Sequence, residues 1–195
     1  FMVLGFCNVA VVRCGGEVLL IDVGAASYGE QVADLVRRAF PSDRVVGIVY
    51  THAHVDHIGG VRSFTERLRA IDGNEHHPLQ LYGHRRVIDR IRRYAATSGY
   101  NAAINARQCP APKEMFVPLF EGLVEPNVLV DDSGTVIAVG KERSISVVLH
   151  HAKGETDDAL WGWIPQTQTL LTGDLFINCC PNCGNPQKAQ RYPLE

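Results

Sequence analysis

The amino-acid sequence predicts an α/β fold in which two β-sheets pack face to face between outer helices, a four-layered αββα sandwich. In the first half of the chain, apolar runs typical of strands alternate with segments whose apolar residues recur at helical spacing. In the second half, strand candidates follow one another after short turns, as in an antiparallel sheet. Strand and helix units followed by a run of strands favour a layered α/β architecture.

The expected elements are short and closely spaced. Strands are predicted at 2–12, 17–23, 45–50, 79–82, 128–130, 135–139, 144–149, 159–164 and 169–172. Helices are predicted at 28–40, around 61–68 and at 85–96. Between 97 and 127 the pattern weakens, and prolines and small residues there indicate a long loop of the kind that often covers an active site.

Length and composition indicate one globular domain that spans residues 1–195. With 46% apolar residues, a chain of 195 residues can build one sizeable core. Its 19 basic and 21 acidic residues leave a formal charge of −2, which provides no electrostatic footprint for nucleic acid or for an anionic membrane. A small-molecule substrate is therefore expected, and a homodimer stays open.

The sequence also bears on localisation. No apolar stretch approaches the roughly 20 residues of a membrane-spanning helix, and no signal peptide is recognisable. We therefore expect a cytoplasmic protein. Because the first residue is Phe1 rather than methionine, we expect the natural N-terminus to lie upstream.

Six cysteines give little information. They are Cys7, Cys14, Cys109, Cys179, Cys180 and Cys183. Cys180 and Cys183 form a single C-x-x-C motif, which leaves redox and metal-binding roles open beside the default of buried or loop thiols. The absence of a second motif of this spacing argues against a zinc ribbon.

The segment Thr51–His57, with the sequence THAHVDH, carries the chemistry. It follows the apolar run 45–50, and ligand-type residues just beyond such a strand lie where α/β proteins place their sites. His52 and His54 can turn toward one ion, while Asp56 and His57 are offset so that they can hold a second. Surface histidines are the simpler interpretation, but three histidines and an aspartate in this pattern favour a site for two divalent ions. Zinc is the expected metal, with manganese or iron as alternatives.

The string THAHVDHIGG resembles the signature of the metallo-β-lactamase superfamily of metal-dependent hydrolases. The run that ends at Asp22-Val23-Gly24 resembles the strand that precedes this signature, and Leu170–Asp174 resembles a later strand that ends in a metal-bridging aspartate. The resemblance covers about residues 8 to 180 and implies a sandwich of the metallo-β-lactamase type. It also implies that Asp22 supports a ligand histidine from outside the ligand set.

The downstream ligands are expected at Glu155 and Asp174. The superfamily commonly has a G-H-T segment where this chain has Glu155, and the string G-E-T-D-D resembles the alkylsulfatase-related branch. One ion would then be held by His52, His54 and Glu155. The other would be held by Asp56, His57 and Asp174. A turn aspartate is the alternative for Asp174, and His151 is either a structural histidine or a supporting partner of the site.

One superfamily ligand has no counterpart. A last histidine usually follows the bridging aspartate, but no histidine occurs after His151. We therefore expect the domain to be truncated at the C-terminus, incomplete at both ends, and weakened in its second metal site.

The resemblance implies hydrolysis by a metal-bound hydroxide, with Asp56 as the catalytic residue that orients the water. The alkylsulfatase branch implies a sulfate ester, for which Arg107 would be an oxyanion partner, and Asn101 lies in a string reminiscent of that branch. The arginines of the predicted helix 85–96, which is strongly basic, more often form a solvated face. A lactonase, a glyoxalase II-type thioesterase, a β-lactamase and a non-catalytic metal-binding domain remain alternatives.

Overall fold

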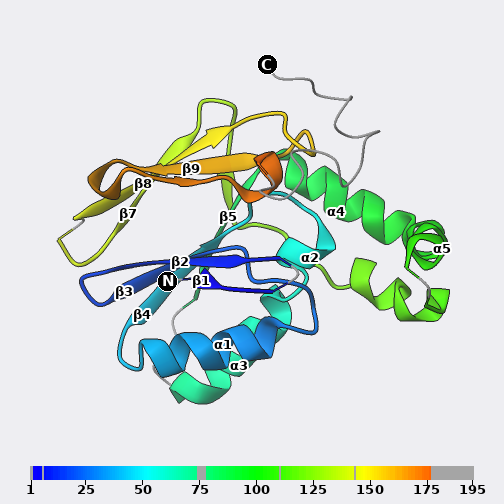
Figure 1. Ribbon diagram of the computed structural model, residues 1–195, viewed down its shortest axis with the longest axis horizontal. Helices are drawn as coiled ribbons and strands as arrows, with labels where there is room; N and C mark the ends of the chain where they lie inside the picture. The colour runs from blue at the N-terminus through cyan, green and yellow to red at the C-terminus, as the bar shows by residue number, and fades with distance from the viewer. Residues whose placement is uncertain (1, 6, 74–77, 110, 143, 177–195) are drawn as a thin grey trace.

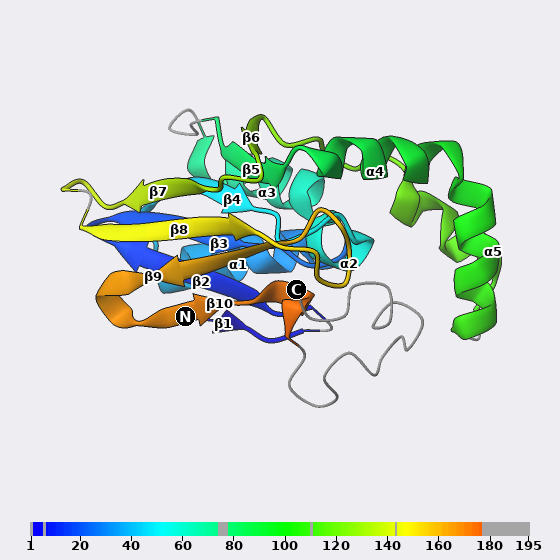
Figure 2. The same cartoon turned by 90° about the horizontal axis from the view of Figure 1, so that it is seen from above.

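The computed structural model describes residues 2–5, 7–73, 78–109, 111–142 and 144–176. Two sheets lie face to face, and the helices α1 (Gly29–Ala39) and α3 (Val61–Asp72) lie outside the larger sheet (Figures 1 and 2). The predicted α/β class with two stacked sheets is confirmed.

The larger sheet has six strands in chain order. They are β1 (Met2–Val3), β2 (Val9–Cys14), β3 (Glu17–Ile21), β4 (Arg44–Val49), β5 (Gln80–His84) and β6 (Val128–Val130). The first three pair antiparallel, whereas β3 to β6 pair parallel. The carboxyl ends of β3 and β4 therefore meet at one edge, which is where the segments with ligand-type side chains begin.

The smaller sheet has four antiparallel strands in the order β10, β9, β8, β7. They are β7 (Thr135–Val139), β8 (Ile145–His151), β9 (Leu160–Ile164) and β10 (Thr169–Leu171). The predicted succession of β6, a tight turn and β7 is found, but the two strands belong to different sheets. At this crossing Gly134 has φ +79°, and a Cβ there would lie 2.3 Å from the carbonyl oxygen of Leu149.

Successive side chains of β3 point to opposite faces of the sheet and so contribute to two separate cores. Val18 and Leu20 pack toward α1 and α3, where Phe64 is among the fully buried residues. Leu19 and Ile21 point the other way, into the layer between the two sheets. Because β3 is buried on both faces, its sequence is a continuous apolar run rather than an alternation of apolar and polar residues.

The segment 97–127, predicted as a loop, contains a helix, so that prediction is wrong. The helix α4 (Arg86–Ala96) is followed after Thr97 by α5 (Ser98–Gln108) and by two 3-10 turns, Lys113–Met115 and Val117–Phe120. Ala102 is the buried residue of α5, so this helix has no apolar stripe that would announce it in the sequence. Together α4 and α5 form an arm that projects beyond the sheets (Figure 2).

The described residues supply three of the four expected layers. The outer face of the smaller sheet carries Val136, Val148, Trp163 and Leu170, which are neighbours across the four strands. Val136 and Leu170 are exposed.

Within the described ranges, no helix is long and apolar enough to span a membrane.

Candidate metal centre

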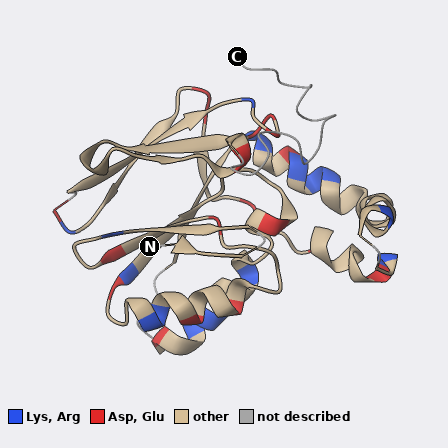
Figure 3. Ribbon diagram, in the orientation of Figure 1, with Lys and Arg blue, Asp and Glu red and all other residues tan. Residues whose placement is uncertain are grey.

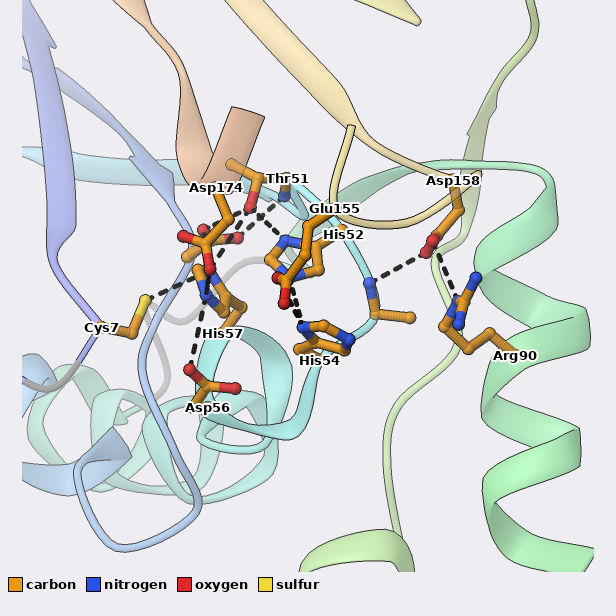
Figure 4. Close-up of polar contacts among 12 residues, drawn as sticks. Cys7, Thr51, His52, His54, Asp56, His57, Arg90, Glu155, Asp158 and Asp174 are labelled. Atoms are coloured by element: carbon orange, nitrogen blue, oxygen red, sulfur yellow. Dashed lines mark hydrogen bonds and ion pairs between the residues drawn. The ribbon is translucent and has the colours of Figure 1, made fainter. Parts of the chain in front are cut away.

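Four segments meet at the carboxyl edge of the sheets (Figure 4). Asp22 follows β3, the segment Thr51–His57 follows β4, Glu155 follows β8, and Asp174 follows β10. Backbone hydrogen bonds fix these loops, because Asp22 N donates to the Val49 carbonyl at 2.8 Å and Leu160 N donates to the Thr51 carbonyl at 2.7 Å. The second of these bonds joins the two sheets at the site.

The first cluster consists of His52, His54 and Glu155. The Nε2 atom of His52 lies 2.8 Å from Nδ1 of His54 and 3.4 Å from Oε2 of Glu155. The Nδ1 atom of His54 lies 3.0 Å from the same carboxylate oxygen. Atoms at the corners of a tetrahedron around a zinc ion, with bonds of about 2.0 to 2.1 Å, are about 3.3 Å apart. Two imidazoles and one carboxylate at these separations fit one divalent ion.

The second cluster surrounds Nε2 of His57. This atom lies 3.5 Å from Oδ2 of Asp56 and 3.4 Å from Oδ2 of Asp174. Ligand-type atoms of His52, His57 and Asp174 also lie within 4.8 Å of one another. Asp174 therefore lies between the clusters, where a carboxylate can contact two ions.

Local backbone geometry produces the offset between the clusters. His54 precedes the single helical turn α2 (Val55–Ile58), so Asp56 and His57 leave the chain in other directions than the two preceding histidines. Asp174 reaches the site because Gly173 adopts φ +49° and packs against Thr51. A Cβ at Gly173 would lie 2.6 Å from Cβ of Thr51, so the close approach requires glycine.

Asp22 and Thr51 set the ring orientations. The carboxylate of Asp22 accepts hydrogen bonds from Thr51 N at 2.8 Å, from Thr51 Oγ1 at 2.7 Å and from His57 Nδ1 at 2.7 Å. Because the Thr51 hydroxyl hydrogen is used on Asp22, its oxygen accepts from Nδ1 of His52 at 3.1 Å. In their neutral forms both histidines then carry their proton on Nδ1 and direct the lone pair of Nε2 into the site.

The environment of His57 favours its protonated form when no ion is bound. Burial opposes the charge, but the carboxylates of Asp22 and Asp174 outweigh burial, so the pKa of His57 lies well above its ordinary value. The Sγ atom of Cys7 lies 3.2 Å from Nδ1 of His57, and burial raises the pKa of this thiol to about 11. The position of Cys7 beside His57 has no signal in the sequence.

The sequence profile of the metallo-β-lactamase superfamily matches residues 2–188. The chain belongs to this superfamily. An uncharacterised protein of Aquifex aeolicus (strain VF5) is 28% identical over 171 residues, which are 88% of this chain and 65% of the relative. The chain thus spans just under two thirds of that relative's length.

Solved structures of the superfamily have the same fold. The inverting sec-alkylsulfatase Pisa1 from Pseudomonas sp. matches with a TM-score of 0.58 and 19% identity, over 84% of this chain and 27% of that chain. The metallo-β-lactamase GOB-18 from Elizabethkingia meningoseptica matches with a TM-score of 0.56 and 17% identity, over 81% of this chain and 49% of that chain. These likenesses confirm the metallo-β-lactamase type of sandwich.

His151 lies in a different cluster from the two described above. It stacks on His84 with ring centroids 4.0 Å apart and an interplanar angle of 6°. Both rings approach Oδ1 of Asp132, at 3.0 Å from His84 and 3.2 Å from His151. Nearly parallel stacked rings cannot both aim in-plane lone pairs at one ion, so this cluster does not fit a metal. His151 reaches the Glu155 loop through the Asp157 carbonyl, 3.0 Å away.

Arginines lie along the basic helix α4 (Figure 3), and several of them pair with acidic side chains. Arg85 pairs with Asp132, Arg86 and Arg90 pair with Asp157, and Arg92 pairs with Glu125. The side chains of Arg85, Arg86 and Arg92 are exposed, as on a solvated face, whereas that of Arg90 is only 14% exposed.

The predicted substrate residues Asn101 and Arg107 lie on α5, at the end of the arm, so the structure does not bring them into the metal clusters. Asn101 donates to Oγ1 of Thr97 at 2.9 Å. The cysteines Cys179, Cys180 and Cys183 lie outside the described residues.

Proposed function

We propose that this chain is a metal-dependent hydrolase that holds two divalent ions, zinc first, and cleaves sulfate esters. The observation that carries the proposal is the convergence of His52 Nε2, His54 Nδ1 and Glu155 Oε2 at 2.8 to 3.4 Å, beside a second cluster around His57. Nitrogen and oxygen donors of this kind suit zinc, with manganese and iron as alternatives.

When bound, two divalent ions activate a water as nucleophile near neutral pH and offset negative charge that develops on the substrate. The chain's own residues prepare the site. Asp22 and Thr51 hold His57 and His52 with Nε2 facing inward. Asp56 is partly exposed, so we assign it to ligation and to orienting the attacking water. Asp174 keeps the two clusters adjacent.

Glu155 supports a sulfate ester over a phosphate ester. A carboxylate in place of an imidazole lowers the positive charge of the loaded site by one unit. A sulfate monoester carries a single negative charge, whereas a phosphate monoester carries about 1.5 to 2 near neutral pH. A less positive site holds the phosphate ester less strongly relative to the sulfate ester. The shared fold with an alkylsulfatase is consistent with this choice.

Arg107 and Asn101 remain proposed substrate residues. The arm that carries them projects beyond the sheets on the side of the molecule where α2 lies (Figures 1 and 2). A sulfate ester whose organic group extends from the metal clusters toward the arm, and carries a polar or charged substituent, would place that substituent near α5. Replacing Arg107 by alanine should then raise KM for such a substrate while the zinc content stays unchanged.

A substrate panel tests the proposal. The zinc-loaded chain is assayed with a sulfate ester, a phosphate ester, a thioester, a lactone and a β-lactam, with Glu155→Ala as the site variant. The matched control is Glu125→Ala, which removes an exposed carboxylate that pairs with Arg92. We expect the sulfate ester to be cleaved fastest, with loss on chelation and in the Glu155 variant only.

Two results would contradict the proposal in different ways. Turnover of a thioester, lactone or β-lactam without turnover of the sulfate ester would keep the hydrolase and reject the substrate. Zinc binding without hydrolysis of any of the five substrates would favour the alternative of a non-catalytic metal-binding domain.

A further inference from the structure

A buried ion pair lies behind the first metal cluster. The side chain of Asp158 is 0% exposed and that of Arg90, on α4, is 14% exposed. The Nε atom of Arg90 donates to Oδ1 of Asp158 at 3.0 Å. Burial alone would raise the pKa of Asp158, but Arg90, Thr156, His52 and the Ala53 N–H together outweigh burial and hold this pKa below its ordinary value.

The second oxygen of Asp158 contacts the metal-binding loop. Oδ2 accepts a hydrogen bond from the backbone N–H of Ala53 at 2.9 Å (Figure 4). Ala53 is the residue between His52 and His54, and it is itself fully buried. The peptide that connects the two imidazoles of the first cluster is therefore tied to a carboxylate, and through it to α4.

Arg90 also holds the segment that provides the third ligand atom. Its Nη2 atom donates to the Asp157 carboxylate, and Nη1 of Arg86 donates to the Asp157 carbonyl at 3.3 Å. Asp157 lies two residues after Glu155. One guanidinium thus contacts both segments of the cluster, the His52–His54 loop through Asp158 and the Glu155 loop directly.

A buried ion pair is a poor device for stability alone. Its desolvation is costly, and well-packed apolar residues in its place often do as well. In contrast, hydrogen-bond acceptors that hold metal ligands in their orientation commonly affect metal affinity. The contacts of Arg90 and Asp158 are made with the segments that supply the ligands, which favours the second role.

We propose that Arg90 and Asp158 are positioning residues for the first metal site. Asp158 fixes the peptide of Ala53 so that Nε2 of His52 and Nδ1 of His54 face one point. Arg90 sets the distance between that loop and Glu155. The inference rests on the proposed function in that it requires an ion in the first cluster.

The test compares Asp158→Ala with a matched ion pair outside the site. Arg37 and Asp72 form a two-point pair between α1 and α3, with Nε to Oδ1 at 2.6 Å and side chains 12% and 16% exposed. Asp72→Ala therefore reports what the loss of a partly buried pair does to the fold. Zinc affinity is measured on the full chain by competition with a chromogenic chelator, and thermal unfolding is measured on the metal-free protein.

We expect Asp158→Ala to weaken zinc binding about 10- to 100-fold, the range found when partners behind metal ligands are removed. Asp158→Asn keeps an oxygen for Ala53 N but turns a donor toward Arg90, so its affinity should lie between that of wild type and that of the alanine variant. Asp72→Ala should lower the unfolding temperature and leave zinc affinity unchanged. An Asp158→Ala protein that binds zinc as tightly as the Asp72→Ala protein would overturn the inference.

A folding defect in Asp158→Ala does not remove the test. Arg90→Gln leaves the carboxylate and Ala53 in place, and we expect it to weaken zinc binding at least about 10-fold. Unchanged affinity in that variant would overturn the role of Arg90. Wild-type protein that takes up no zinc would contradict the proposed function, and the inference with it. Zinc binding by wild type together with unchanged affinity in both variants rejects the inference alone.

Discussion

Replacing Asp22 by asparagine probes the support behind both clusters. Asp22 is buried, with a side chain 2% exposed, and it adopts φ +61° beside Thr51 and His57. Its Oδ1 accepts from Thr51 N, whereas Oδ2 accepts from both Thr51 Oγ1 and His57 Nδ1. The amide nitrogen of asparagine, in place of Oδ2, is a hydrogen-bond donor that would face two other donors, the Thr51 hydroxyl and the His57 Nδ1–H.

The magnitude follows from these contacts. A buried donor without a partner costs about 1 to 3 kcal/mol, and a hydrogen bond to a charged group contributes about 1.5 to 3 kcal/mol. The Thr51 hydroxyl can rotate, so we count one lost bond at His57 and part of a second, or about 2 to 4 kcal/mol in the free energy of unfolding. At roughly 2 to 4 °C per kcal/mol for a chain of this size, the metal-free protein should melt about 4 to 16 °C lower.

Thermal unfolding followed by circular dichroism measures the loss, and an NMR titration of the imidazole measures the pKa of His57. This pKa should fall toward its ordinary value, because Asp22 contributes most among the groups that raise it. Asp34→Asn is the control, since Asp34 pairs with Arg67 on the surface and should leave both measurements unchanged. A melting shift equal to that of the control, or an unchanged His57 pKa, would refute the reasoning.

Three further predictions concern the ligands. Glu155→Ala should weaken zinc binding by about one ligand's contribution, while Glu155→His should retain binding and, because the loaded site is then more positive, shift relative rates from the sulfate ester toward a phosphate ester. Equal zinc affinity in wild type and the alanine variant would exclude Glu155 as a ligand. His54→Ala should abolish hydrolysis and lower the melting temperature of the zinc-loaded protein toward that of chelator-treated wild type. Because the pKa of His57 is raised above its unfolded value of about 6.5, its contribution to metal-free stability is present at low pH and is lost as pH rises through the folded pKa. At pH values below the folded pKa, zinc binding should displace the proton of His57, and calorimetry in buffers of different ionisation enthalpy measures this release.

The parts of the fold that bury a continuous or periodic apolar pattern could be predicted. Val18 to Ile21 and the run that forms β4 fill two cores, so their strands were evident from residue type. The helix α5 could not be found in this way, because Ala102 is its buried residue and the helix has no apolar stripe. The crossing at Gly134 between the sheets depends on tertiary contacts that no local pattern records.

The candidate site divides in the same way. His52, His54, Asp56 and His57 lie within one short segment after a strand, so their proximity follows from chain connectivity. Glu155 is about a hundred residues away, and only the resemblance to the superfamily placed it beside them. The supporting residues Cys7, Thr51 and Asp158 were missed, because their contacts with the site arise from the folded backbone; the position of Thr51 at the start of the motif was the one signal available.

The occupancy of the two clusters tests the central claim most directly. Metal-free protein is dialysed against increasing zinc, and bound zinc per chain is measured by elemental analysis for wild type and for His54→Ala. We expect wild type to bind two ions, the first more tightly than the second, and the variant to lose the tight one. Wild-type protein that binds no zinc at saturation, or a variant with the same binding curve as wild type, would contradict the assignment of the two clusters as a binuclear metal centre.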